Sequence, residues 1–474
     1  MICRWHGVSV EPDKYPNMAN TFRQNAQVAV IGAGNVGIAV AYYLATEQGI
    51  DNIVLLDPLP PMSLTSAQSG ENYRDWWPHA IMTEFTSHSI SLMEQIEKAH
   101  PGALAMKRGG YALATRNRQP AELIENLHRT YANGAGEIRT HDASLGQYRF
   151  DRTCAWQEAP DGVDVILGAD LVHQAFPEFA PDIESVIHIR RAGSISAHDL
   201  GRVMLDALRA RGVHVHPGRV VGISHAGQYH LDVLDGAGGS QTLVADAIVN
   251  AAGPHANDVA RMLGQNLPIY NVYQQKIAFD DVLQAILRDM PFAIDIDGQT
   301  LAWADEERAL INDDPEMRHL LDAMPGNIHC RPDGPRSGQR IKLGWAYNKA
   351  RSDIRQGEPL DSQFPEIVLR GASRLHPGLK AYLGHLPAAI SHYGGYYTMN
   401  DENLPLIGPL DGHAAFMAVA LSGYGTMGAC AAGSLCAAWV ARKTPSALAS
   451  SLTLGRYDDP ALMAEIQAHG QGEL

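Results

Sequence analysis

The sequence predicts an α/β fold, α+β overall, in which a Rossmann-like domain is interrupted by an inserted, mainly antiparallel β domain. Apolar strand patterns alternate with helical patterns near the start, in the middle and at the end of the 474-residue chain. Such alternation is typical of a parallel sheet covered by helices. Residues 111–183 and 267–397 lack this alternation and are richer in strand patterns, so they predict a second domain.

The clearest β-α-β unit lies near the start of the chain. Residues 27–31 and 53–56 are apolar runs typical of buried parallel strands. Between them, residues 36–44 carry apolar side chains at helical spacing. Asp57 and Pro58 close the second run, so we expect two adjacent strands joined by one helix.

Two further units follow downstream. The middle unit combines an amphipathic helix at 199–211 with strand patterns at 213–215 and 247–249. The last unit combines a strand at 415–421 with a helix of small residues from about 427 to 441. Small residues on several faces of a helix predict close packing on all sides.

We therefore expect two discontinuous domains. The Rossmann-like domain comprises residues 27–110, 186–263 and 398–465, and the inserted, substrate-binding domain comprises residues 111–185 and 264–397.

Composition excludes several classes of function. The chain has 37 basic and 52 acidic residues, a net charge of −15, which argues against nucleic acid as a partner. It has no run of 18 apolar residues, so we expect no membrane span. Five scattered cysteines, and a start at 1–27 without a signal pattern, predict a cytoplasmic protein. The sequence does not decide whether the protein is a homo-oligomer. The acidic helical segment 305–324 is a lid, a subunit contact or a surface helix.

A glycine motif follows the first strand. In Gly32-x-Gly34-x-x-Gly37, the glycines permit a tight turn, close approach of the backbone to a pyrophosphate, and packing of helix on strand. The free N–H groups of the helix N-terminus bind phosphate, and an acid about 20 residues later binds ribose. The motif predicts these dinucleotide-binding residues: Gly32, Gly34, Asn35, Val36, Gly37, Asp57 and Pro58.

Five other segments distinguish FAD from NAD. They are residues 65–77 (TSAQSGENYRDWW), 108–114 (RGGYALA), 250–255 (NAAGPH), 403–409 (NLPLIGP) and 421–425 (LSGYG). In this combination and order the chain resembles the FAD-dependent amine oxidoreductases of the D-amino-acid oxidase group, with sarcosine oxidases and dimethylglycine dehydrogenase as similar members. The resemblance covers about residues 27–460.

The resemblance implies further FAD-binding residues. Those expected against the flavin are Thr65, Ser66, Gln68, Ser69 and Gly70, and Val221 is expected at the adenine. Ala252 and Gly253 are expected at the pyrophosphate, and Gly423, Tyr424, Gly425, Thr426 and Met427 at the pyrimidine edge of the flavin. The last loop also opens a helix, whose positive end would stabilise the negative charge of a reduced flavin.

Five residues are candidates for catalysis. Arg74 and Arg331 are candidates for holding a substrate carboxylate, because the lysine that sarcosine oxidases use falls near Tyr397 or Thr398 in this chain. Tyr396 and Tyr397 are candidates for contacting the substrate, and Lys276 for assisting the reaction of O2. The alternatives are structural ion pairs, core aromatics and a surface lysine.

The resemblance predicts FAD that is bound without a covalent link. Relatives with a covalent flavin carry a histidine where this chain has Gln68, or a cysteine near the segment that corresponds to residues 339–344, which contains none. No metal site is expected, because no cysteine or carboxylate accompanies the histidines at 214 and 216.

The implied reaction is oxidation of the C–N bond of an amino acid or N-alkylated amine. Hydride passes from the carbon beside the nitrogen to flavin N5, the imine hydrolyses, and O2 or an electron carrier reoxidises the flavin. Two alternatives are a 2-hydroxy acid or polyol dehydrogenase with the same fold, and a flavin-fold assembly protein without catalysis.

Overall fold

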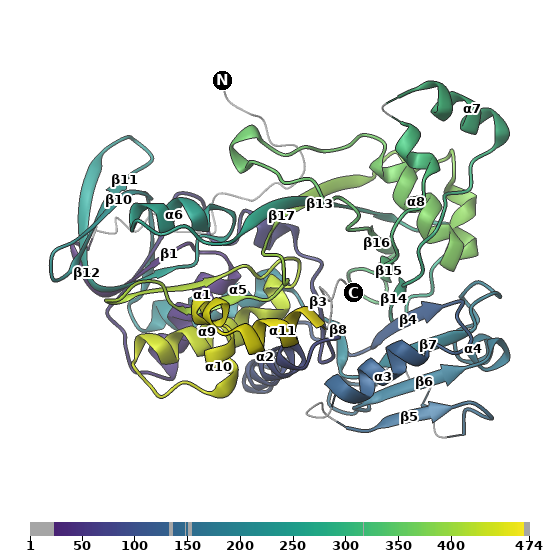
Figure 1. Cartoon of the computed structure of the whole chain (residues 1–474), viewed down its shortest axis with the longest axis horizontal. Coiled ribbons are helices and arrows are strands. Elements are labelled where there is room, and N and C mark those ends of the chain that lie inside the picture. Colours follow the sequence, from purple (N-terminus) through teal and green to yellow (C-terminus); the bar gives the residue numbers. More distant parts are fainter. Residues whose placement is uncertain (1–22, 132–135, 147, 150–153, 316, 469–474) are drawn as a thin grey trace.

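The computed structural model describes residues 23–131, 136–146, 148–149, 154–315 and 317–468. Figure 1 shows two bodies that lie side by side, with the long strands β13 (Tyr270–Asp280) and β17 (Ser391–Met399) reaching from one to the other. Most of the expected N-terminal segment 1–27 lies outside the described residues.

The first body is built on a sheet that contains eight strands within the described residues. They are β1 (Asn25–Ile31), β2 (Ile53–Asp57), β9 (His214–Pro217), β10 (Arg219–His225), β11 (Tyr229–Leu234), β12 (Ser240–Asn250), β18 (Leu406–Pro409) and β19 (Ala415–Val419).

The centre of this sheet is parallel. Strands β19, β12, β1, β2 and β9 lie side by side in that order and run in the same direction. Strand β12 begins earlier than the sequence suggested. Its first half pairs with β11 in an antiparallel hairpin. The predicted parallel unit of β1 and β2 is confirmed, and the strand predicted at 247–249 is the end of β12.

Helices cover this sheet and the second one. In chain order they are α1 (Asn35–Thr46), α2 (Ala80–Ala99), α3 (Ala121–Thr130), α4 (Ala169–Ala175), α5 (Ala197–Ala210), α6 (Ala256–Met262), α7 (Asp305–Asp313), α8 (Phe364–Leu375), α9 (Gly425–Val440), α10 (Ala447–Ser451) and α11 (Pro460–Ala468). Helices α1, α5 and α9 agree with the predicted helices within a few residues.

The small residues of α9 bring it into direct contact with α1. A Cβ atom added to Gly433 would lie 2.6 Å from the carbonyl carbon of Ala39, so the two backbones touch. Helix α9 buries small side chains along most of its length, as its composition predicted. Both helices begin at the same edge of the sheet, which fixes their N-termini close together.

The second body is built on a nine-stranded, mainly antiparallel sheet within the described residues, in the order β17-β13-β16-β15-β14-β4-β7-β6-β5. Its other strands are β4 (Tyr111–Thr115), β5 (Ile138–His141), β6 (Val163–Leu167), β7 (Ser185–Ile189), β14 (Phe292–Asp295), β15 (Ile328–Pro332) and β16 (Arg340–Gly344). A short pair, β3 (Asn72–Arg74) and β8 (Ala192–Ser194), lies between the two bodies.

We propose that the two domains follow the two sheets. The expected boundary after residue 185 then needs correction, because it falls inside β7, which pairs with β4 and β6. The boundary after residue 397 falls inside β17, which pairs with β13. Among the described residues, no helix is both long and apolar enough to cross a membrane.

We predict that Gly433→Ala destabilises the fold. Its methyl group would push the backbones of α1 and α9 apart, at a cost of about 1–3 kcal/mol, which should lower the thermal unfolding midpoint. Gly412→Ala is the control, since nothing lies within 4 Å of a Cβ atom there. Equal midpoints for the two variants would contradict the close packing.

Candidate functional site

A cavity of about 450 Å³ opens where the parallel strands end. The ends of β1 and β2, the segment that follows β12, and the segment that follows β19 all contribute to its wall. Because carboxyl ends of parallel strands meet at one edge, four segments far apart in sequence converge here. Residues of β13 and β17 close the other side.

The turn after β1 leaves no room for side chains. Gly32 has a φ of +110°, and a Cβ atom there would lie 2.3 Å from the carbonyl oxygen of Ala251. A Cβ atom on Gly37 would lie 1.9 Å from the carbonyl oxygen of Gly32. The turn therefore folds tightly against the segment after β12, and the N-terminus of α1 faces the cavity with its positive dipole end.

Asp57 shapes one end of the cavity. Its two carboxylate oxygens accept hydrogen bonds from the backbone N–H groups of Ala33 at 2.8 Å and Leu59 at 2.9 Å. Burial raises the pKa of Asp57, while these hydrogen bonds and the charges of His255 and Arg219 act in the opposite direction. Each carboxylate oxygen keeps acceptor capacity for a ligand hydroxyl group.

The N-termini of α1 and α9 meet in the middle of the cavity. Thr426 Oγ1 accepts a hydrogen bond from Asn35 Nδ2 at 3.3 Å and lies 2.8 Å from Ser69 Oγ. The backbone N–H of Asn35 donates to Ser66 Oγ at 3.0 Å. Asn35 Oδ1 is buried without a hydrogen-bond partner, on the side of Gly201 of α5.

Lys276 and Tyr397 form the opposite end of the cavity. Lys276 is buried, and its Nζ donates to the Tyr397 hydroxyl at 3.2 Å and lies 5.2 Å from the centre of the Tyr397 ring. The ring lies against Gly423, where a Cβ atom would be 2.4 Å from it. Lys276 is therefore not the surface lysine that was the alternative from the sequence.

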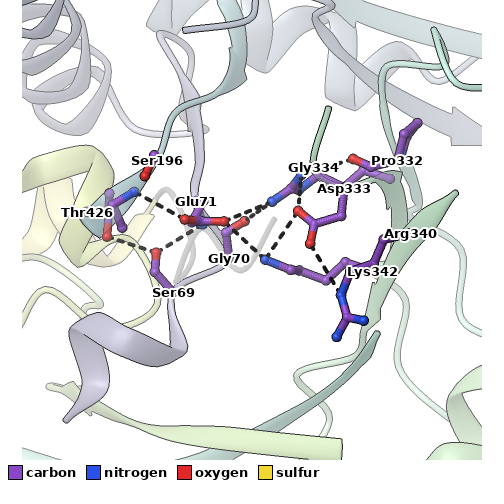
Figure 2. Close-up of polar contacts among 12 residues, drawn as sticks. Ser69, Gly70, Glu71, Ser196, Pro332, Asp333, Gly334, Arg340, Lys342 and Thr426 are labelled. Carbon is purple, nitrogen blue, oxygen red and sulfur yellow. Dashed lines mark hydrogen bonds and ion pairs between the residues drawn. The ribbon is translucent and has the colours of Figure 1, made fainter. Parts of the chain in front are cut away.

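A network of ion pairs joins the segment after β2 to strands β15 and β16 (Figure 2). Glu71 Oε2 lies 3.3 Å from Lys342 Nζ and 3.5 Å from Arg331 Nη2. Asp333 pairs with Arg331 at 2.9 Å and with Lys342 at 3.6 Å. Arg331 also donates to the carbonyl oxygen of Gly70, so this network fixes the backbone at the edge of the cavity.

The structure places the two candidate arginines outside the walls of this cavity. The buried Arg74 stacks on Trp77, 4.4 Å from its ring centre, and lies 5.7 Å from that of Tyr111. Burial lowers the pKa of Arg74 to about 10. Arg331 belongs to the ion-pair network, as the structural alternative predicted.

The side chain of Tyr396 is packed mainly into the core. It lines the cavity but is buried, its hydroxyl donates to the carbonyl oxygen of Gly357, and its ring packs on Tyr273 with centres 5.0 Å apart. Tyr396 is therefore a core aromatic, which was the alternative from the sequence. Tyr397 instead accepts a hydrogen bond from Lys276 through its hydroxyl.

The residues that the sequence suggested for dinucleotide binding all line the cavity, except Gly37, Tyr424 and Met427. Gly37 packs behind the turn. Tyr424 is buried, with its hydroxyl donating to the carbonyl oxygen of Asn403, and Met427 Sδ accepts a hydrogen bond from the Arg74 N–H. Both side chains are buried in the core, Tyr424 at the N-cap of α9 and Met427 in its first turn.

Sequence reasoning missed several lining residues. Gly218 and Arg219 follow β9, and Ser422 precedes α9. Gly218 donates its N–H to the carbonyl oxygen of Asp57, which brings the start of β10 to the acidic end of the cavity. The glycine between two strand patterns was the available signal.

A family model described as "DAO: FAD dependent oxidoreductase" matches residues 27–439. The chain belongs to this family. The match includes the strands and helices around the cavity. The glycine turn and the helix N-terminus fit a dinucleotide with a pyrophosphate in its middle.

Relatives of known structure share the fold at low identity. L-proline dehydrogenase from P. horikoshii is 16% identical with a TM-score of 0.67, over 92% of this chain and 99% of that chain. Glycine oxidase from Geobacillus kaustophilus is 16% identical with a TM-score of 0.63, over 89% and 96% of the two chains.

Mitochondrial dimethylglycine dehydrogenase of Rattus norvegicus is a sequence relative. It is 21% identical over 453 residues, which is 94% of this chain but 46% of the relative. The chain therefore spans about half the length of the curated relatives it matches.

Proposed function

We propose that the protein oxidises the C–N bond of an amino acid or N-alkylated amine. The buried Lys276–Tyr397 pair carries this proposal. Among the described residues that line the cavity, the acids are Asp57 and Asp258, and the charges of His255 and Arg219 act on Asp57. Arg219 and His255 therefore belong to the Asp57 end of the cavity. Lys276 is the cation at the other end, which Tyr397 and Gly70 form.

A lysine and a tyrosine hydroxyl suit a carboxylate. The ammonium group supplies charge and the hydroxyl supplies a second hydrogen bond. The same positive charge disfavours a substrate ammonium group close by, which favours the neutral amine whose lone pair assists C–H cleavage. Bound FAD supplies the electron acceptor, while these side chains hold and orient the substrate.

The names of the relatives support an amine substrate. The dehydrogenases and the oxidase described above are named for dimethylglycine, proline and glycine. All three are carboxylates with a nitrogen on the neighbouring carbon, which is the chemistry that the Lys276–Tyr397 end would recognise.

We further propose a cytoplasmic protein that O2 or an electron carrier reoxidises. Among the described residues, the buried Cys330, Cys430 and Cys436 are free thiols, which fits a reducing compartment.

The proposed function predicts which compounds bleach the flavin. Under anaerobic conditions, amino acids or N-methylated amino acids should remove the flavin absorbance near 450 nm as about one equivalent is oxidised. The matched 2-hydroxy acids and polyols should leave it unchanged. Bleaching by hydroxy compounds alone would assign the chain to that class, and no bleaching by either class would favour a role without catalysis.

We also propose that FAD is bound without a covalent link. Gln68 lines the cavity, no cysteine of the described residues does, and the lining histidine, His255, lies beside Asp57. Acid precipitation should therefore release all of the yellow colour into the supernatant. Colour that stays in the pellet after washing would contradict this.

A further inference from the structure

A second cavity, of about 380 Å³, lies beside the first and shares no lining residue with it. The starts of β4 and β14, the end of β15 and the β3–β8 pair surround it. Asn72 lines it, two residues after Gly70, which lines the first cavity. The segment from Gly70 to Asn72 therefore separates the two cavities.

Cations dominate the described wall of this second cavity. Its five basic residues are Lys107, Arg108, Arg288, Arg331 and Arg336, against the acids Glu97 and Asp289. Glu97 is already engaged, because its two oxygens accept the N–H groups of Gly102 and Leu104, both at 2.7 Å.

Two of these cations already have carboxylate partners. Arg331 pairs with Glu71 and Asp333, and Arg108 pairs with Glu94 and Asp161. Lys107, Arg288 and Arg336 form no ion pair with any described residue. Asp333 attracts Lys107 and Arg288 without pairing with either, and Lys107 and Arg336 are exposed, so these three cations are accessible to a ligand.

Neutral groups hold two of these three cations in place. Lys107 donates to the carbonyl oxygen of Gly334, and Arg288 donates to the carbonyl oxygens of Asp333 and Pro335 at 2.7 and 3.0 Å. A carbonyl satisfies a donor but does not cancel a charge. These bonds also fix the loop 333–336, which carries Arg336 into the wall.

Buried polar atoms without partners lie in the same wall. They are Nε of Arg108, Arg288 and Arg331, together with Oδ1 of Asn72. Partial burial lowers the pKa of Lys107, the charges of Arg331, Arg288 and Arg336 lower it further, and the charge of Asp333 acts in the opposite direction. The cations thus lie close enough to repel one another, which a bound anion would relieve.

We propose that this second cavity binds a small multivalent anion, a phosphate or a dicarboxylate, through Lys107, Arg288 and Arg336. Three converging cations favour a multivalent anion over a monovalent one. The site goes beyond the proposed amine oxidation and does not depend on it.

Titration calorimetry of the FAD-loaded protein tests the site. Inorganic phosphate, succinate and acetate are titrated at an ionic strength fixed with NaCl. Phosphate or succinate should bind saturably, and acetate at least about tenfold more weakly. Tighter binding of phosphate assigns a phosphoryl ligand, and tighter binding of succinate assigns a dicarboxylate.

Glutamine variants separate charge from anchoring. In Lys107→Gln the amide still donates to the Gly334 carbonyl, so the loop keeps its anchor while the charge is lost. Lys107→Gln and Arg336→Gln should each weaken dianion binding about five- to tenfold. Arg308→Ala, which removes an exposed cation of α7, should leave it unchanged.

Two results would overturn the proposal. One is the absence of saturable binding of both dianions, and the other is equal affinity in wild type, Lys107→Gln and Arg336→Gln. If the dianion binds as expected while no amine bleaches the flavin, the proposed oxidation fails and the anion site stands.

Discussion

The backbone contact at the end of β1 is the constraint on which the rest of the site depends. Gly32 lies against Ala251, and Gly37 lies against Gly32, at distances that exclude any side chain. This contact sets the N-terminus of α1 at the cavity. The contact between Gly433 and Ala39 then holds α9 beside α1, so that two helix N-termini face one cavity.

The two bodies meet around this constraint. Strands β13 and β17 extend from the second sheet over the cavity and bring Lys276 and Tyr397 to it. On the other side, the ion pairs of Glu71 with Lys342 and Arg331 tie the segment after β2 to strands β15 and β16. Arg331 and Lys342 are the more buried members of this network, so removing their carboxylate partners would leave buried cations alone. The second cavity lies beside the same network, with Arg331 in its wall.

Local signals predicted the parallel sheet and the dinucleotide end of the site well. These signals are the glycine motif, Asp57 and the turn at Ala252 and Gly253. Each depends on backbone atoms close by in the sequence, so its spacing predicts its geometry. Side-chain direction was harder to predict. Gly423, Gly425 and Thr426 line the cavity. Tyr424 and Met427 lie among and beside them in the sequence, yet their side chains are buried in the core. Arg74 and Arg331 were expected at the substrate, but Arg74 stacks on Trp77 and Arg331 pairs with Asp333 and Glu71, outside the cavity. The second cavity had no sequence signal, because Lys107, Arg288 and Arg336 come from separate segments, with successive gaps of 181 and 48 positions.

The central claim, that Lys276 holds the substrate in the cavity, is tested most directly by anaerobic stopped-flow reduction of the bound flavin. The amino acid that bleaches the flavin best is mixed with wild type, Lys276→Met and the exposed control Lys380→Met. The account predicts that Lys276→Met raises the substrate dissociation constant at least about tenfold, because a charged hydrogen bond to the carboxylate is lost, and that Lys380→Met does not. An unchanged dissociation constant in Lys276→Met, with slower reoxidation by O2 alone, would contradict the claim and assign the lysine to the oxygen reaction.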